Sequence, residues 1–508
     1  MPNRLLLTPS RVVWKRHQFR SAPRRGTIAA FICVGVLCCV CDILFPARVG
    51  LGIAGIVYGF WSMWLAVRES RATVLRVNPL VTYQIWQAAT MGLSPLYIAL
   101  THSAEDLVPF GPRLVPLAQI AYGHAILVVG AFALYLGMKQ FQPKEAITRS
   151  VGVRAPSAWE LLTCFFAGTA ILIFSDQITA SMGSVFAGLS TMPLAVLSLF
   201  AIKPPAGLWR SRGAYWAVLM VGTVVLVLLN ARDASKMMLS FSFVPLALAS
   251  VRRKGTGVLM AFGIGFVALY LLVIAPLVGT TRGAVQMDDR GRRNVLGADA
   301  IGNVWPQLQS DFKNDLTQYL RTGLDSTMLR LCDPVAAGVV SDFVATGGLL
   351  RGAGMDYVPM AFIPRTLWHD KPIIERGRHF TAVLGQASDA SSATSSSGQT
   401  AAGELFWNFS WPGVLIGMYL LGAAFSGAWW GADRGDPTSG VLEMTAFIGI
   451  TLSFVVGVGS VAGGEFVTAI ASGIVLRALI RARDLALRRN RGRYRGAVAA
   501  APQIATCR

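Results

Sequence analysis

Long apolar segments recur along this chain and constrain its fold more than any other feature. A helix needs roughly 20 mostly apolar residues to cross the hydrocarbon core of a bilayer. Hydrophobic residues make up 54% of the 508 residues and charged residues only 14%, which is outside the usual range of soluble domains. We therefore expect an all-α polytopic membrane protein with about twelve transmembrane helices, at residues 27–45, 50–67, 80–100, 115–138, 158–175, 182–201, 213–230, 237–251, 256–279, 404–430, 441–459 and 465–480.

The basic residues of the chain predict its orientation. The formal net charge is +20, and it is concentrated in the terminal tails, 1–26 and 481–508, and in alternate short loops. Cytoplasmic segments of membrane proteins carry such an excess of Lys and Arg. We therefore expect both termini to lie in the cytoplasm, which requires an even number of spans. Because the charge follows the topology in this way, we expect no nucleic-acid partner.

One polar segment, 281–403, interrupts the series of apolar spans. It separates the helices of 27–280 from those of 404–480, and it carries twelve basic and twelve acidic residues. A loop of this length usually has a function or is disordered. Since it joins the ninth span to the tenth, we expect an extracytoplasmic loop domain. Its apolar stretch 334–350 contains Asp342, which would cost roughly 2.5–3.5 kcal/mol at a bilayer centre, so we predict a helix resting on the membrane surface there.

The loop contains the sequence FIPRTLWHDKP at residues 362–372. Its prolines restrict the backbone around Arg365 and Lys371, whose charges suit phosphate oxygens, while Trp368 offers an aromatic plane for the apolar face of a sugar. Such a cluster fits a pyrophosphate-linked sugar at the membrane surface. The alternative is an interfacial belt, in which Trp and basic residues only anchor the loop at headgroup level.

Further candidate residues lie at the outer ends of the spans. Arg232 and Arg282 each begin an outer loop, where the alternative to ligand binding is a role in topology. Glu404 begins the tenth span, where a carboxylate either interacts with the helix dipole alone or serves as a general base.

Sequence motifs for a metal site or a nucleotide cofactor are missing. The chain has no HExxH, EF-hand or P-loop pattern, and its one CxxC spacing, Cys38 to Cys41, stands alone in an apolar span. The seven cysteines offer no disulfide framework. We therefore expect neither a metal nor another cofactor.

Downstream of FIPRTLWHDKP, the chain continues with GELFWNF at 403–409 and WPG at 411–413, which lead into a span. This arrangement resembles the second large outer loop of the Wzy-type oligosaccharide repeat-unit polymerases, the O-antigen and exopolysaccharide polymerase family. The resemblance covers residues 362–413, and the rest of the chain agrees in topology, with many spans and a late outer loop. The chain departs from the family at Ser410, since it has NFSW where the family often has NFGW.

The resemblance implies a metal-independent membrane glycosyltransferase at the outer face of a bacterial inner membrane. It would polymerise undecaprenyl-diphosphate-linked oligosaccharide repeat units into O-antigen or exopolysaccharide, without a cofactor. Its partners would be these lipids, the bilayer, and flippase and chain-length regulator proteins. The acceptor hydroxyl would be deprotonated by Glu404, Asp370 or His379. The residues that bind diphosphate or substrate would be Arg232, Arg282, Arg365, Lys371, Arg376, Trp368, Trp407 and Asn408.

Three alternative functions stay open at this point. An O-antigen ligase would pass the same donor to a lipid A core and would need much the same site. A polysaccharide transporter or flippase suits twelve spans, although such folds usually show paired halves. A metal-dependent membrane glycosyltransferase would need an acidic pair in the first outer loop, whereas here Asp42 lies within the first span and the next turn offers only Arg48.

Overall fold

The computed structural model describes ten main segments of the chain. They are residues 25–71, 79–102, 107–110, 113–140, 158–174, 191–202, 212–232, 312–355, 376–385 and 398–432, with short pieces between 204 and 389. Outside the described residues lie the expected spans 441–459 and 465–480, nearly all of 256–279, most of 237–251, and the tails except residues 25 and 26. All statements below concern the described segments.

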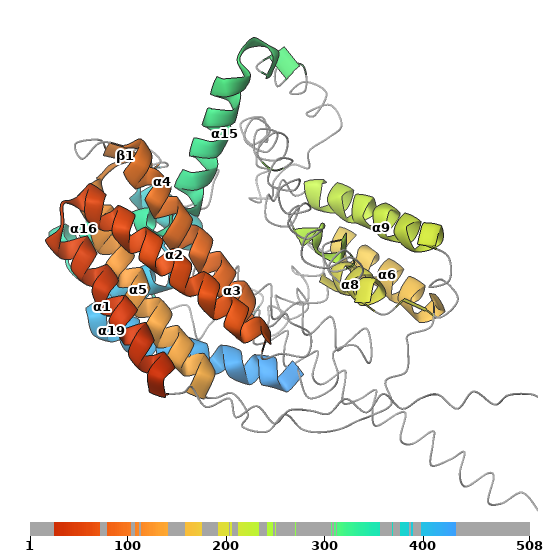
Figure 1. The fold of residues 1–508 in the computed structure, drawn as a ribbon, viewed down its shortest axis with the longest axis horizontal. Coiled ribbons are helices and arrows are strands. Elements are labelled where there is room, and N and C mark those ends of the chain that lie inside the picture. The colour runs from red at the N-terminus through yellow and green to blue at the C-terminus, as the bar shows by residue number, and fades with distance from the viewer. Residues whose placement is uncertain are drawn as a thin grey trace, which may run out of the picture.

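Helices dominate these segments, as the apolar runs predict (Figure 1). The bundle that carries the first hydrophobic core is built from α1 (Arg25–Leu44), α2 (Ala47–Arg71), α3 (Pro79–Gln87), the π-helical turn η1 (Ala88–Leu93), α4 (Ser94–Thr101), α5 (Leu117–Gln140), α15 (Leu316–Leu331), α16 (Asp333–Gly347), α18 (Arg376–Val383) and α19 (Ala401–Ala432). A second core joins α6 (Ala158–Ile173), α8 (Met192–Ile202) and α9 (Arg212–Arg232).

Five of the described helices are long and apolar enough to cross a membrane. They run over Gly26–Leu44, Ala47–Glu69, Leu117–Gln140, Gly213–Asn230 and Ala401–Ser426. The chain is therefore a mostly helical protein with the composition of a membrane protein. The count of twelve spans and the layout of the loops stay predictions.

One small sheet interrupts the helices. Strands β1 (Leu107–Phe110) and β2 (Arg113–Pro116) form an antiparallel hairpin with Phe110 opposite Arg113, directly before α5. This hairpin is an addition to the expected helical fold, which the described segments otherwise show. Because a two-stranded hairpin satisfies its backbone polar groups locally, it can close the short connection between two helices.

Glycines on α5 allow the backbones of its neighbours to approach closely. Gly123, Gly130 and Gly137 recur every seventh residue, so they lie near one stripe of the helix. A methyl group on Gly123 would overlap the Pro334 carbonyl of α16, and one on Gly137 would overlap the Tyr419 carbonyl of α19. Small residues of this kind are the usual contacts between membrane helices, because lipid supplies no hydrophobic drive for their association.

Helix α16 confirms the predicted helix but not its predicted position. Residues 334–340 are buried in the bundle core, packed against α5 and α19, and only the stretch 345–349 is exposed. The expected helix resting on a membrane surface is therefore wrong for its first half. The sequence could not show this, because the contact depends on Gly123 and Gly338 meeting across two distant segments.

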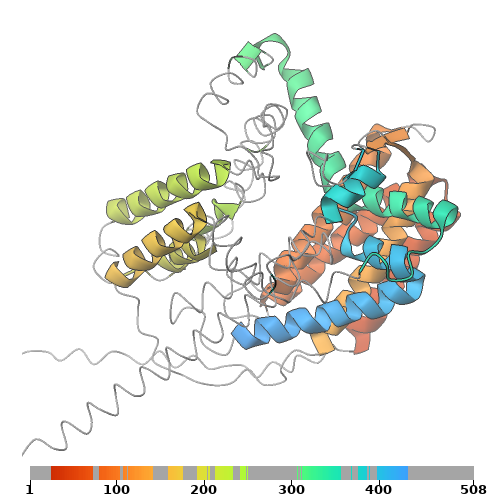
Figure 2. The ribbon, with the colours of Figure 1, turned by 180° about the vertical axis from the view of Figure 1, so that it is seen from behind.

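Helix α19 reverses direction at Ser410, whose φ of 57° and ψ of −152° are not helical. In a straight helix Leu405 and Gly417 would lie ~18 Å apart. Here a methyl group on Gly417 would lie about 2.5 Å from the Leu405 side chain, so the first part of α19 folds back on the second. Figure 2 shows the short first part beside the long second part, both in blue. The expected single span 404–430 is therefore two helical pieces.

The close approach of α16 to α5 predicts that a side chain added at Gly123 lowers the stability of the protein. Gly123→Ala should destabilise the folded protein by about 1–3 kcal/mol, because the added methyl group must displace the backbone of α16. The thermal midpoint of the detergent-solubilised protein measures this. The control is Gly213→Ala in α9, where the new methyl group meets no atom within 4 Å. Equal midpoints for the two variants would contradict the proposed packing.

Asp333 predicts a pH dependence of stability. Burial raises the pKa of this carboxyl to about 7. Since the pKa lies above its unfolded value of 3.8, ionisation costs stability as the pH rises from about 4 to about 7. Asp333→Asn should therefore raise the thermal midpoint relative to wild type at pH 8 but not at pH 4. Parallel midpoint curves over that range would refute this.

Candidate functional site

A pocket lies where α16, α18 and α19 meet. Its cavity volume is about 40 Å³, which is room for a few water molecules, and it is partly open to solvent. Three segments contribute its walls: the loop after α16, helix α18 and the first part of α19. Its lining residues are Leu350, Gly354, His379, Phe380, Gln399, Glu404, Trp407 and Asn408.

Glu404 reaches this pocket from the first turn of α19 and is only 2% exposed. Thr400 forms the start of the helix, since its hydroxyl accepts from the Gly403 N–H at 3.1 Å and its carbonyl from the Glu404 N–H at 2.9 Å. The N-terminus of a helix stabilises a negative charge. The local sequence thus holds a buried carboxylate at a helix start that faces a pocket.

Asn408 ties the two sides of the pocket together. Its Nδ2 donates to the Glu404 carbonyl at 2.9 Å, and its Oδ1 accepts from the Gly354 N–H at 3.0 Å. At the start of the same loop, the Leu350 N–H donates to the Trp407 carbonyl at 3.0 Å. Asn408 is 1% exposed. Because both ends of its amide are used, it fixes the loop of residues 350–354 against the helix that carries Glu404.

Backbone strain gathers around the same pocket. Within the described segments, the non-glycine residues with positive φ are Arg351 at 51°, Thr400 at 62° and Ser410 at 57°. Arg351 and Thr400 adjoin the lining residues Leu350 and Gln399, and Ser410 follows Asn408 by two positions. Such conformations cost on the order of 1–3 kcal/mol each and cluster at functional sites.

Aromatic side chains form one wall of the pocket. Trp407 packs edge-on against Phe380, with ring centroids 6.0 Å apart, and stacks on Phe343 of α16 at 5.3 Å. His379 lies beside Phe380 on α18, and its side chain is exposed. The pocket therefore presents a carboxylate, an imidazole and an indole ring, a set able to contact a sugar at its open side and to accept a proton from a hydroxyl.

The structure brings together part of the predicted site. Glu404, His379, Trp407 and Asn408 all line the pocket, although His379 and Glu404 are 25 positions apart. Trp368 is half-buried and is not among the lining residues. Arg376 begins α18 and Arg232 ends α9, and nothing is described of their side chains. Outside the described residues lie Asp370, Arg282, Arg365 and Lys371.

Sequence reasoning missed the loop of residues 350–354. No motif of the sequence pointed to this loop, yet it supplies Leu350 and Gly354 to the pocket. The sequence feature that could have indicated this loop is its high density of glycines. In the structure, Gly348 and Gly352 have positive φ, and Gly354 leaves no room for a side chain beside Asn408.

Metal ligands do not gather in the described segments, which contain no group of three His, Cys, Asp or Glu side chains able to hold an ion. Comparisons of the chain with protein-family models, with curated proteins and with solved structures find no match. The function must therefore be argued from the residues and their arrangement.

Ser410 gives a direct test of the strain beside the pocket. Its φ and ψ fall in a region that only glycine occupies readily, so Ser410→Gly should stabilise the protein by about 1 kcal/mol. A higher thermal midpoint in detergent is the expected result. Ser341→Gly in the regular helix α16 is the matched control and should lower the midpoint, because glycine weakens a helix interior. A lower midpoint for Ser410→Gly would contradict the strain.

Proposed function

We propose that this protein polymerises undecaprenyl-diphosphate-linked oligosaccharide repeat units into O-antigen or exopolysaccharide. The observation that carries the proposal is the pocket itself. It joins Glu404, Trp407 and Asn408 from the GELFWNF segment to His379, which follows FIPRTLWHDKP closely in the sequence. Both segments belong to the part of the chain that resembles the Wzy-type polymerases.

The chemistry of such a transfer needs a base and a site for a charged leaving group. Glu404 takes the proton from a hydroxyl of the acceptor unit, and the hydroxyl oxygen attacks the anomeric carbon of the donor chain. The bond from that carbon to the diphosphate breaks, and undecaprenyl diphosphate leaves with the electron pair. His379 and Asp370 are the other candidate bases, and Trp407 carries a sugar on its ring.

The leaving diphosphate gains negative charge in this step, so fixed positive charges lower the barrier. Arg365 and Lys371 in FIPRTLWHDKP fill this role in the proposal, together with Arg232, Arg282 and Arg376, while Trp368 packs against the substrate. Arginine suits diphosphate because its planar guanidinium binds two oxygens at once. The apolar helices suit a lipid substrate that stays in the outer leaflet of a bacterial inner membrane.

Deleting the gene tests the class of function. A polymerase mutant should display single repeat units at the cell surface, or lose the exopolysaccharide, while lipid-linked units still reach the outer face. A transporter mutant should instead trap lipid-linked units on the cytoplasmic side. Lipid-linked units trapped on the cytoplasmic side would contradict the proposed polymerase function.

Glu404→Gln tests the proposed base. The variant keeps the size of the side chain but cannot accept the proton, so polymer length and yield should fall by about 100-fold or more, as for loss of a general base. The measurement is the glycan ladder on a gel, compared at equal amounts of protein in the membrane. His379→Gln should have the next largest effect, and His102→Gln, in a loop outside the pocket, should have none. Polymer of normal length from Glu404→Gln would exclude Glu404 as the base.

A further inference from the structure

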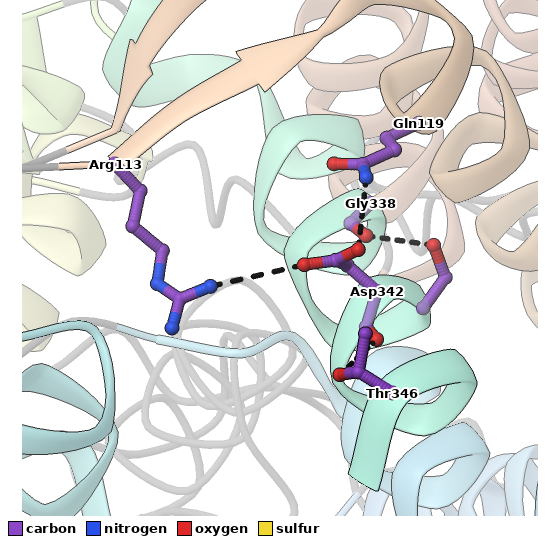
Figure 3. A network of polar contacts seen from close by, with 6 residues as sticks. Arg113, Gln119, Gly338, Asp342 and Thr346 are labelled. Atoms are coloured by element: carbon purple, nitrogen blue, oxygen red, sulfur yellow. Dashed lines mark hydrogen bonds and ion pairs between the residues drawn. The ribbon is translucent and has the colours of Figure 1, made fainter. Parts of the chain in front are cut away.

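Arg113, at the start of β2, reaches across to α16. Its Nη1 lies 3.8 Å from Oδ2 of Asp342 (Figure 3). Its Cζ lies 4.4 Å from the centre of the Phe343 ring. The guanidinium therefore contacts two consecutive side chains of α16. The ion pair is weak because about a third of each side chain is exposed, 39% for Arg113 and 33% for Asp342. The second contact places the guanidinium carbon over the face of the Phe343 ring.

Asp342 is held from a second side as well. Gln119 of α5 donates from Nε2 to Asp342 Oδ1 at 3.0 Å, and the Thr346 hydroxyl donates to the Asp342 carbonyl at 2.8 Å (Figure 3). Ser341 donates to the Gly338 carbonyl in the same part of the helix. The hairpin and α5 thus hold this turn of α16 from two directions, which fixes the rotation of α16 and the place of Phe343.

Phe343 connects Arg113 to the aromatic residues of the pocket by direct contacts. Its ring lies between the Arg113 guanidinium and Trp407, with which it stacks at 5.3 Å and an interplanar angle of 28°. It also meets Phe380 edge-on at 6.4 Å. Trp407 and Phe380 both line the pocket. A continuous series of contacts therefore runs from Arg113 through Phe343 to the aromatic wall.

We infer that Arg113 is a positioning residue that sets the plane of Trp407 through Phe343, and so determines how the pocket holds a sugar of the lipid-linked substrate. The inference rests on the proposed function. Arg113 is not among the pocket's lining residues, so it acts on substrate only through the two rings. Lysine cannot replace it, because the flat guanidinium is what lies against the Phe343 ring.

Kinetics with the purified full-length protein test this inference. The substrate is the lipid-linked repeat unit isolated from cells that lack the gene. Arg113→Ala and Phe343→Leu should each raise KM about 3- to 10-fold, the effect of losing one ring contact, and leave kcat within about twofold. The double variant should match the single variants, because both changes break the same series of contacts.

Two conservative variants separate stacking from charge. Phe343→Tyr keeps the ring and should behave as wild type. Asp342→Asn removes the ion pair but keeps an oxygen for Gln119, so KM should change less than twofold. An Arg113→Ala variant with the KM of wild type, or a double variant with the product of the two single effects, would overturn the inference.

A second measurement is independent of turnover. In protein labelled with 5-fluorotryptophan, the fluorine NMR signal of Trp407 is identified by its loss in Trp407→Phe. Arg113→Ala and Phe343→Leu should shift that signal, and Asp342→Asn should not. If the Trp407 signal does not shift in Arg113→Ala and Phe343→Leu, the positioning role of Arg113 is wrong, even if the wild-type protein makes polymer. If the signal shifts but wild type makes no polymer from the isolated units, the proposed function fails instead.

Discussion

The close approach of backbones along α5 is the constraint on which the rest of this structure depends. Gly123 faces the backbone of α16, Gly137 faces the backbone of the second part of α19, and Gly130 faces side chains from both parts of α19. Because a glycine of α5 lies at each of these contacts, α16 and the folded α19 are both placed by one helix. The pocket lies between those two elements, so its dimensions follow from glycines that line no part of it.

Packing against α5 also explains how the strained backbone near the pocket persists. Ser410 permits the reversal of α19 only at a conformational cost, and burial of Leu405 against Gly413 and Gly417 offsets that cost. Thr400 and Arg351 hold similarly unfavourable conformations at the other edges of the pocket. The strain is concentrated where Glu404, Asn408 and the 350–354 loop are held together, which is the pattern expected of a site that needs a fixed geometry.

The sequence predicts the long apolar helices well and their partners poorly. The helices at 25–44, 47–71 and 117–140 appear within a few residues of expectation, because continuous apolar runs leave no other backbone structure in a bilayer. In the sequence, the reversal at residue 410 was visible only as a serine where the family that this segment resembles often has glycine. Arg113 was missed because its partners lie more than 220 positions away, and no local pattern connects them.

Two buried pairs of ionisable side chains within the described bundle have structural explanations. Pro95 has no N–H to donate to the Met91 carbonyl, four residues earlier in the π-helical region, and His124 Nε2 donates to that carbonyl instead at 2.9 Å. Asp42 orients the imidazole, since its Oδ2 lies 2.7 Å from Nδ1. At the opposite end of α5, Lys139 pairs with Glu69 at 2.6 Å. These pairs join α1, α2 and α5, and the contact with His124 uses only Oδ2 of Asp42, since its Oδ1 is buried without a hydrogen-bond partner among the described residues.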